Sequence, residues 1–416
     1  MGWPGHRHWP AVIVTILAPL ATLCEAGCDK KESGGTSPNA GTTGATPSAS
    51  HGPATLQVNM GCALVVPGGN VLPKLGAGTL SIAAEKGKAL VVDTAPGGAH
   101  ATRILLGATG APEGAAEPID DVLAKGTAAS TFASAIAFEG ELASFAFAYG
   151  APPPTPTQCA DGVFAMKRSG PTGARRDVTH ACRTTTMLRA AARREIGVAI
   201  LDGPAGADAW ILDRADTRYL HLEHLGSPSA AIVETAAAAG ATSVAAAWVV
   251  KDGPKRELHA ARIGRGGERL GAVEVLDKQH AGSVAMAFEG DTLHVVWSSF
   301  RTDKNIYALQ WTKWPAGGAP APPQAIGTGV VSASSPSIAI DGSRIMLAWV
   351  EGDEKTATVK VGASKTGLVA ISGAATVASN PGVAASGPVV AVDDDAMFVT
   401  WKESGSEVRA STLKCR

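Results

Sequence analysis

Apolar and polar residues alternate in short runs that recur along the second half of the chain. Three segments carry the pattern most clearly, and each ends in a tryptophan: 284–297, 336–349 and 388–401. A period of two is that of a β-strand, because successive side chains of a strand point to opposite faces. The three tryptophans lie 52 residues apart. A repeat of this length is typical of a multi-stranded blade rather than of a single hairpin.

Weaker copies of the pattern precede these three segments. They end near Val92, Phe147, Trp210 and Trp248, which gives seven anchor positions at intervals that average about 52 residues. At least one further strand-like run follows several of the anchors. We therefore predict an all-β fold, a β-propeller with about seven blades. Six or eight blades are also possible, because the registers near Val92 and Trp210 are loose.

The two ends of the predicted propeller complete each other. After Trp401 one strand-like run remains, EVRASTLKCR, which is too short to finish a four-stranded blade. The run around Cys62 has no partner near the start of the propeller. We predict that this N-terminal strand completes the last blade, since closure removes exposed sheet edges. A disulfide between Cys62 and Cys415 would then lock the seam.

The segment at about 150–195 interrupts the repeat and is predicted to be an insertion. Cys159 and Cys182 lie within it, and a disulfide between them would close a loop of about 23 residues and contribute about 3 kcal/mol by loop-closure entropy. The segment also carries a basic run that includes Arg175, Arg176, Arg183, Arg193 and Arg194. These arginines form either an anion-binding patch or the solvated face of an exposed loop, and we favour the solvated face.

The chain begins with a targeting segment. An apolar run at 11–23 follows basic residues and is shorter than the ~20 residues that a membrane-spanning helix requires, so 1–27 is predicted to be a cleaved signal peptide. The sequence Ala26-Gly27-Cys28 resembles the lipobox of bacterial lipoproteins, which implies lipidation of Cys28. Residues 28–54 are rich in Gly, Ser, Thr and Pro and are predicted to be a flexible tether. A plain secretory signal and lipidation at Cys24 are the alternatives.

Length and charge narrow the possible functions. A chain of 416 residues with 45% hydrophobic residues is long enough to bury a large core, and we assign 55–416 to the propeller. The formal net charge of −1 argues against a nucleic-acid partner. Four of the six cysteines remain after the signal peptide and Cys28 are set aside, an even number that suits two disulfides in an exported protein.

An acidic residue recurs eight positions before the anchor in five copies of the pattern: Glu139, Asp202, Glu289, Asp341 and Asp393. These acids suggest catalysis or a ring of metal ligands, but carboxylates beside glycines at tight turns usually form the turn, and we favour that interpretation. The run Asp393-Asp394-Asp395 is a candidate calcium site without ligands at a defined spacing. We expect the tryptophans to pack between blades rather than stack on a ligand. We assign no catalytic residue, metal site or cofactor.

The repeat resembles the sialidase-like, Asp-box class of β-propellers, in which Ser-x-Asp-x-Gly-x-Thr-Trp recurs from blade to blade. Ser337-Ile-Ala-Ile-Asp341-Gly342 carries the resemblance here without the Asp-x-Gly spacing. For the enzymes of the class, the resemblance implies an arginine triad, a Tyr/Glu nucleophile pair and an Asp acid. The chain has three tyrosines, Tyr149, Tyr219 and Tyr307, and no Phe-Arg-Ile-Pro motif; the nearest is Phe300-Arg301-Thr302-Asp303. Sialidase activity is therefore not expected.

These observations predict a lipid-anchored, monomeric β-propeller that is exported to a bacterial cell envelope, at the inner or the outer membrane. We predict a non-catalytic binding or scaffold module for a protein or glycan partner. The alternatives are a sialidase-like glycoside hydrolase and an envelope assembly factor.

Overall fold

The computed structural model describes residues 62–415 apart from 77, 120–129, 150–160, 170–174, 183–186, 204–205, 214–216, 226, 228, 328, 343, 354, 366–374, 378–383, 394–395 and 404–405. The described residues form β-strands and one short 3-10 helix, η1 (Pro96–Gly98). Within these ranges, no helix is long and apolar enough to cross a membrane.

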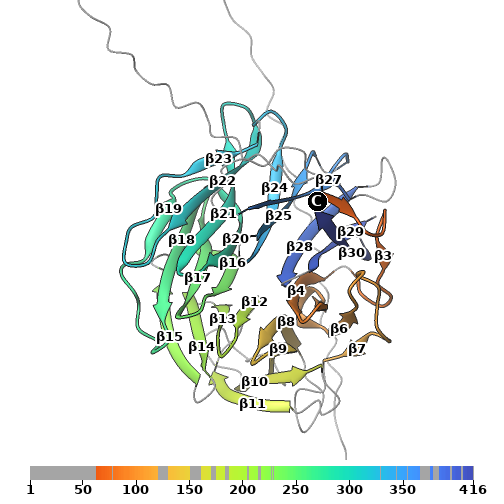
Figure 1. Ribbon diagram of the computed structural model, residues 1–416. Helices are drawn as coiled ribbons and strands as arrows, with labels where there is room; N and C mark the ends of the chain where they lie inside the picture. Colours follow the sequence, from red (N-terminus) through yellow and green to blue (C-terminus); the bar gives the residue numbers. More distant parts are fainter. Residues whose placement is uncertain are drawn as a thin grey trace, which may run out of the picture. The chain divides into compact units, whose positions relative to one another are not determined.

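The strands form seven antiparallel sheets, which are the blades of a propeller (Figure 1). Blade one consists of β4 (Thr79–Glu85), β5 (Lys88–Thr94), β6 (Ala101–Leu106) and β7 (Glu117–Pro118). Blade two consists of β8 (Ser130–Phe138), β9 (Glu141–Tyr149), β10 (Asp161–Arg168) and β11 (Arg175–Cys182). Blade three consists of β12 (Leu188–Arg193), β13 (Ile196–Gly203), β14 (Gly206–Asp213) and β15 (Thr217–His224). Blade four consists of β16 (Ala231–Ala239), β17 (Ser243–Asp252), β18 (Lys255–Gly264) and β19 (Glu274–Asp277). Blade five consists of β20 (Ala281–Glu289), β21 (Thr292–Arg301), β22 (Ile306–Trp314) and β23 (Gln324–Ile326). Blade six consists of β24 (Ala333–Asp341), β25 (Arg344–Glu351), β26 (Thr358–Lys365) and β27 (Ala375–Thr376).

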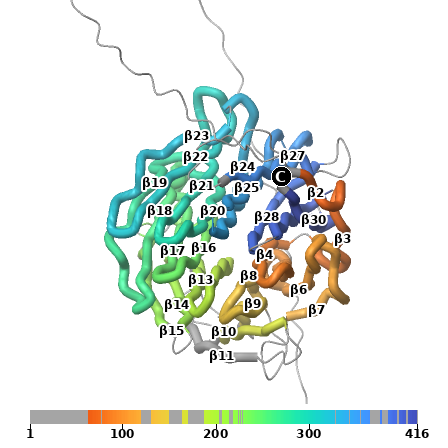
Figure 2. Tube along the Cα trace, in the orientation of Figure 1, coloured from red at the N-terminus to blue at the C-terminus, as the bar shows by residue number. Residues whose placement is uncertain are grey.

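Blade seven joins the two ends of the described chain. Its strands are β28 (Ala385–Asp393), β29 (Ala396–Glu403), β30 (Glu407–Cys415) and β2 (Cys62–Leu64), and β3 (Asn70–Val71) also pairs with β30. Figure 2 shows the orange N-terminal strands beside the blue C-terminal ones. The first strand of each blade contacts the first strand of the next, and β28 contacts β4. The predicted seven blades and their closure by the N-terminal strand are therefore confirmed.

Cys62 lies directly opposite Cys415 in the pairing of β2 with β30. Opposed Cα atoms in antiparallel strands are about 4.5–5.5 Å apart, within the range of about 4.4–6.8 Å that a disulfide spans. The disulfide itself stays a prediction.

Mass spectrometry of unreduced peptides is expected to find Cys62 linked to Cys415. Reduction is expected to lower the free energy of unfolding by about 2–5 kcal/mol, because the bond constrains the unfolded chain. A Cys62→Ser/Cys415→Ser variant supplies the control, since reduction should not destabilise it through this bond. A bond between Cys62 and Cys159 would contradict the prediction.

The segment predicted as an insertion at about 150–195 continues the repeat where it is described. β10 and β11 are the outer strands of blade two, and β12 is the innermost strand of blade three. These strands correct the prediction of an insertion. The outer strand β11, RRDVTHAC, is mostly polar, so it lacks the apolar alternation that identified the other strands.

Four tryptophans occupy the second strands of blades four to seven: Trp248, Trp297, Trp349 and Trp401. Each is buried in a cluster shared with the preceding blade, as the tryptophan pattern predicts. Trp210 differs, because it lies in β14, the third strand of blade three, and is only partly buried. Trp210 therefore lies one strand later in its blade than the repeat predicts, and this corrects the prediction for blade three. Asp202 accordingly belongs to the hairpin between β13 and β14.

Candidate binding site in the central channel

The seven innermost strands enclose a channel with two chambers. The N-terminal chamber, of about 370 Å³, is lined by the first halves of these strands, and the C-terminal chamber, of about 450 Å³, by their second halves. One residue from each blade lines both chambers and forms what we call the apolar ring: Ile82, Ala135, Ala190, Ala237, Met286, Ile338 and Val390. The small alanines of blades two to four leave the channel open beside them.

A bulge shapes the N-terminal chamber on the side of blades four to seven. In each of these blades the pairing of the first and second strands shifts by one residue near the start of the first strand. The residue fourteen positions before the tryptophan lies at this bulge and lines the chamber; these residues are Glu234, Ser283, Ser335 and Gly387. Ser335 and Gly387 have φ of +50° and +55°. Bulges re-aim side chains, and here they turn one position per blade toward the channel.

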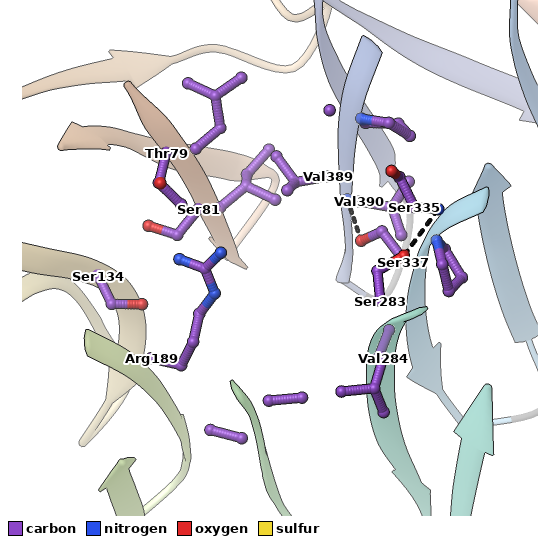
Figure 3. A pocket seen from close by; sticks show the side chains of 18 of the residues that line it. Thr79, Ser81, Ser134, Arg189, Ser283, Val284, Ser335, Ser337, Val389 and Val390 are labelled. Atoms are coloured by element: carbon purple, nitrogen blue, oxygen red, sulfur yellow. Dashed lines mark hydrogen bonds between the residues drawn. The ribbon is translucent and has the colours of Figure 1, made fainter. Parts of the chain in front are cut away.

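Serines tie neighbouring blades together around the N-terminal chamber (Figure 3). The Oγ of Ser81 accepts the Ala135 N–H of the next blade at 2.9 Å, and the Oγ of Ser337 accepts the Val390 N–H at 3.1 Å. A hydroxyl oxygen that accepts such a bond keeps its own proton for another partner. Among the described residues, nothing accepts the protons of Ser81 and Ser337. Both hydroxyls are therefore positioned donors in the chamber wall.

Two cations from different blades share the N-terminal chamber. The Arg189 side chain extends from β12 into it, and Lys402 reaches it from β29 (Figure 3 shows Arg189). Arg189 has no hydrogen bond, and no ion pair within 4.0 Å, among the described residues. The Lys402 ammonium donates to the carbonyl oxygen of Gly78. Burial lowers the pKa of Lys402, and the Arg189 charge adds to this effect against the opposing Asp93 carboxylate.

Glu234 is the one carboxylate among the described residues that line the N-terminal chamber. It is half-buried on β16, the strand that follows β12 around the ring. Burial raises the pKa of Glu234, although the positive charges of Arg189 and Arg256 and a hydrogen bond from the Thr235 N–H oppose the shift. The described lining of the chamber therefore presents two cations, and hydroxyl donors that include Ser81 and Ser337, against one carboxylate.

Three charged side chains of the C-terminal chamber have partners in other blades. Asp341 of blade six and Arg193 of blade three approach to 3.6 Å, and Asp393 accepts the Gly87 N–H of blade one. The basic run of the sequence is thus divided, since Arg193 and Arg194 line this chamber while Arg175 and Arg176 lie on the outer strand β11. Arg183 lies outside the described residues.

The remaining recurrent acids also bond outside their own turns. Glu139 forms an ion pair with Arg168, and Asp202 accepts the Met187 N–H at 2.6 Å. The acids lie at the ends of hairpins, as predicted. Their carboxylates also form hydrogen bonds or ion pairs with residues beyond those turns. No group of three or more His, Cys, Asp or Glu side chains in the described ranges is placed to hold a metal ion.

Glu289 forms a hydrogen bond with the fully buried side chain of His294. The Nε2 of His294 is 3.0 Å from a Glu289 carboxylate oxygen, and its Nδ1 is 3.3 Å from Nε1 of Trp311. Because an indole N–H only donates, Nδ1 accepts and Nε2 carries the proton. Burial lowers the pKa of His294 to about 4, and the Lys313 charge adds to this effect while Glu289 opposes it.

Lowering the pH from about 6.5 to about 4 is expected to destabilise the protein through His294. The unfolded imidazole binds a proton near pH 6.5 and the folded one only near pH 4, so the free energy of unfolding should fall by about 3 kcal/mol across this window. The change is fully present below pH 4 and absent above pH 6.5. Urea unfolding of the wild type and of His294→Gln, whose side chain does not titrate, checks it. Equal losses in the two proteins would refute this role.

Arg189, Lys402 and Glu234 are not among the site residues that the sequence predicts. Arg189 falls in the segment predicted as an insertion, and Lys402 follows Trp401 directly in the sequence. The position fourteen residues before the tryptophan carries Glu, Ser, Ser and Gly in blades four to seven, so no shared residue type marks Glu234 in the sequence. Of the predicted cysteines, Cys28 and Cys159 lie outside the described residues, and the backbone of Cys182 pairs with that of Asp161.

Comparison with known proteins identifies the fold and no family. No protein-family model and no curated protein matches the chain. An ulvan lyase of a new polysaccharide lyase family is 11% identical with a TM-score of 0.51, over 86% of this chain and 94% of that one. The same kind of lyase bound to -[GlcA(1-4)Rha3S]- has a TM-score of 0.50, with the same identity and coverage. The endosialidase of phage phi92 is 9% identical over 86% of this chain and 69% of that one, with a TM-score of 0.48.

Proposed function

We propose that this protein is a non-catalytic glycan-binding β-propeller, held at a bacterial cell envelope by a lipid on Cys28, whose N-terminal chamber binds an acidic glycan. The observation that carries the proposal is the excess of donors in that chamber. The Arg189 guanidinium and the Lys402 ammonium offer charged donors, and Ser81 and Ser337 offer neutral ones. Charge-assisted hydrogen bonds to a carboxylate or sulfate are the strongest bonds such groups form.

The composition of the chamber favours binding over hydrolysis. Glycoside hydrolysis ordinarily uses two carboxyl groups that flank the scissile bond. Glu234 has no second carboxylate beside it in the described lining, and no tyrosine lies there to serve as a nucleophile. Tyr219 is 52% exposed on the outer strand of blade three, away from the channel lining. Glycan binding also suits the ulvan lyase likeness, which by itself concerns only the fold.

A glycan panel tests the proposed function. The full-length protein is applied to neutral, uronate-containing and sulfated glycans, and the bound material is analysed by mass spectrometry. We expect retention of acidic glycans alone and their release at unchanged mass. Release of shortened products would contradict the non-catalytic assignment. Absence of glycan binding, with a protein recovered reproducibly from envelope extract, would favour a scaffold function.

A Cys28→Ser variant is expected to lose lipid labelling and to become soluble after export. Cys28 follows Ala26-Gly27, and the tether that follows it would let an anchored propeller stand away from the membrane. Metabolic labelling with a radioactive fatty acid and fractionation of membranes check the result, with Cys24→Ser as the matched control. A Cys28→Ser protein that stays labelled and membrane-bound would refute the anchor.

A further inference from the structure

Glu234 differs from its equivalents in the neighbouring blades. The bulge position that it occupies in blade four carries serine in blades five and six and glycine in blade seven. Those residues can hydrogen-bond an acidic ligand or make room for it. The Glu234 carboxylate instead brings a negative charge into the chamber that we assign to an acidic glycan.

The positive charges near Glu234 stabilise its ionised carboxylate only in part. Arg189 comes from β12, the neighbouring innermost strand, and Arg256 from β18 of the same blade. Neither makes an ion pair with Glu234 within 4.0 Å. The neighbouring innermost strand on the other side, β20, presents the uncharged Ser283. Lys402 is the other charged residue in the described lining of this chamber, and the Asp93 carboxylate acts on Lys402 from outside that lining.

An acidic ligand must therefore share the chamber with Glu234. Bonded to Arg189, its anionic group lies in the electrostatic field of the Glu234 carboxylate, where low dielectric strengthens the repulsion. A proton on Glu234 removes that repulsion. Because burial raises the pKa of Glu234, less free energy is needed to protonate it than to protonate a solvated carboxylate.

We propose that Glu234 is the selectivity-determining residue of the N-terminal chamber, and that binding of an acidic sugar is coupled to the uptake of one proton by its carboxyl group. The proposal rests on the proposed function. The proton comes from solvent and neutralises Glu234, while the anion of the ligand forms an ion pair with Arg189. Acidic sugars then bind more tightly as the pH falls through the pKa of Glu234, and neutral sugars bind independently of its charge.

Isothermal titration calorimetry of the full-length protein with sodium glucuronate tests this coupling between about pH 5 and pH 8. Each titration is repeated in two buffers with different heats of ionisation, so that the difference in heat counts the protons taken up. The wild type is expected to take up nearly one proton at the upper end and to lose about tenfold in affinity across the range. Glu234→Gln should take up about one proton fewer than the wild type and keep the tighter binding. Glu85→Gln, in the C-terminal chamber, is the matched control and should behave like the wild type.

The outcomes separate the two proposals. If wild type and Glu234→Gln bind glucuronate with the same pH dependence, the coupling is overturned and the proposed function stands. If neither protein binds glucuronate or any acidic glycan of the panel at any pH, both are overturned. Loss of the Lys402 charge at high pH weakens both proteins alike, so it does not imitate the effect of Glu234.

Discussion

Replacing Trp401 with alanine is expected to lower the free energy of unfolding by about 3–5 kcal/mol. The indole is fully buried in the cluster between blades six and seven. Its Nε1 donates to a Glu403 oxygen at 3.0 Å, and the other Glu403 oxygen lies 2.9 Å from Nε of Arg409. Arg409 in turn donates to the Gly68 carbonyl at 3.0 Å, so the indole connects the core to the seam where the chain ends meet.

Truncation removes packing and leaves a buried carboxylate without its indole donor, and both effects destabilise the fold. Urea unfolding followed by circular dichroism measures the change. Trp210→Ala is the matched control, because that indole is only partly buried on a third strand, and its cost should be clearly smaller. Trp401→Phe should recover part of the loss. Equal stabilities for the Trp401 and Trp210 variants would contradict the assignment of Trp401 to the core.

Replacing Arg189 with alanine is expected to weaken binding of an acidic glycan about 100-fold, because a bidentate pair of charged hydrogen bonds contributes about 3 kcal/mol. Arg189 has no hydrogen-bond partner among the described residues, so its loss should leave the melting temperature nearly unchanged. Arg189→Lys should keep part of the affinity, since it restores the charge without the planar fork.

The control for this prediction is Arg193→Ala, four residues further along the same chain segment. Arg193 lines the C-terminal chamber and is paired with Asp341 at 3.6 Å, so its loss should affect stability more than binding. Fluorescence or calorimetric titration with a glycan selected from the panel measures both variants. Equal losses of affinity would show that the channel responds to total charge, and the assignment of Arg189 to the binding site would then be wrong.

The alternation of apolar residues, by itself, determined the architecture of this protein. Strand periodicity is a local property of the sequence. Trp297, Trp349 and Trp401 recur at a constant spacing, and each of them marks one blade. The prediction of closure succeeded for a similar reason, because an unfinished last blade and an unpaired first strand need each other. Burial of the tryptophans between blades follows from the same alternation.

Only the tertiary structure decided the register of blade three and the content of the channel. The second strand of that blade, IGVAILDG, is apolar on both faces and therefore shows no alternation. For this reason the repeat places the anchor at Trp210, which lies on the next strand. A bulge adds one residue and thereby shifts the phase on which a period-two pattern depends. Arg189, Glu234 and Lys402 belong to three blades, and their proximity arises when the ring closes. No local pattern can encode that proximity, so the chemistry of the channel becomes visible only in the folded chain.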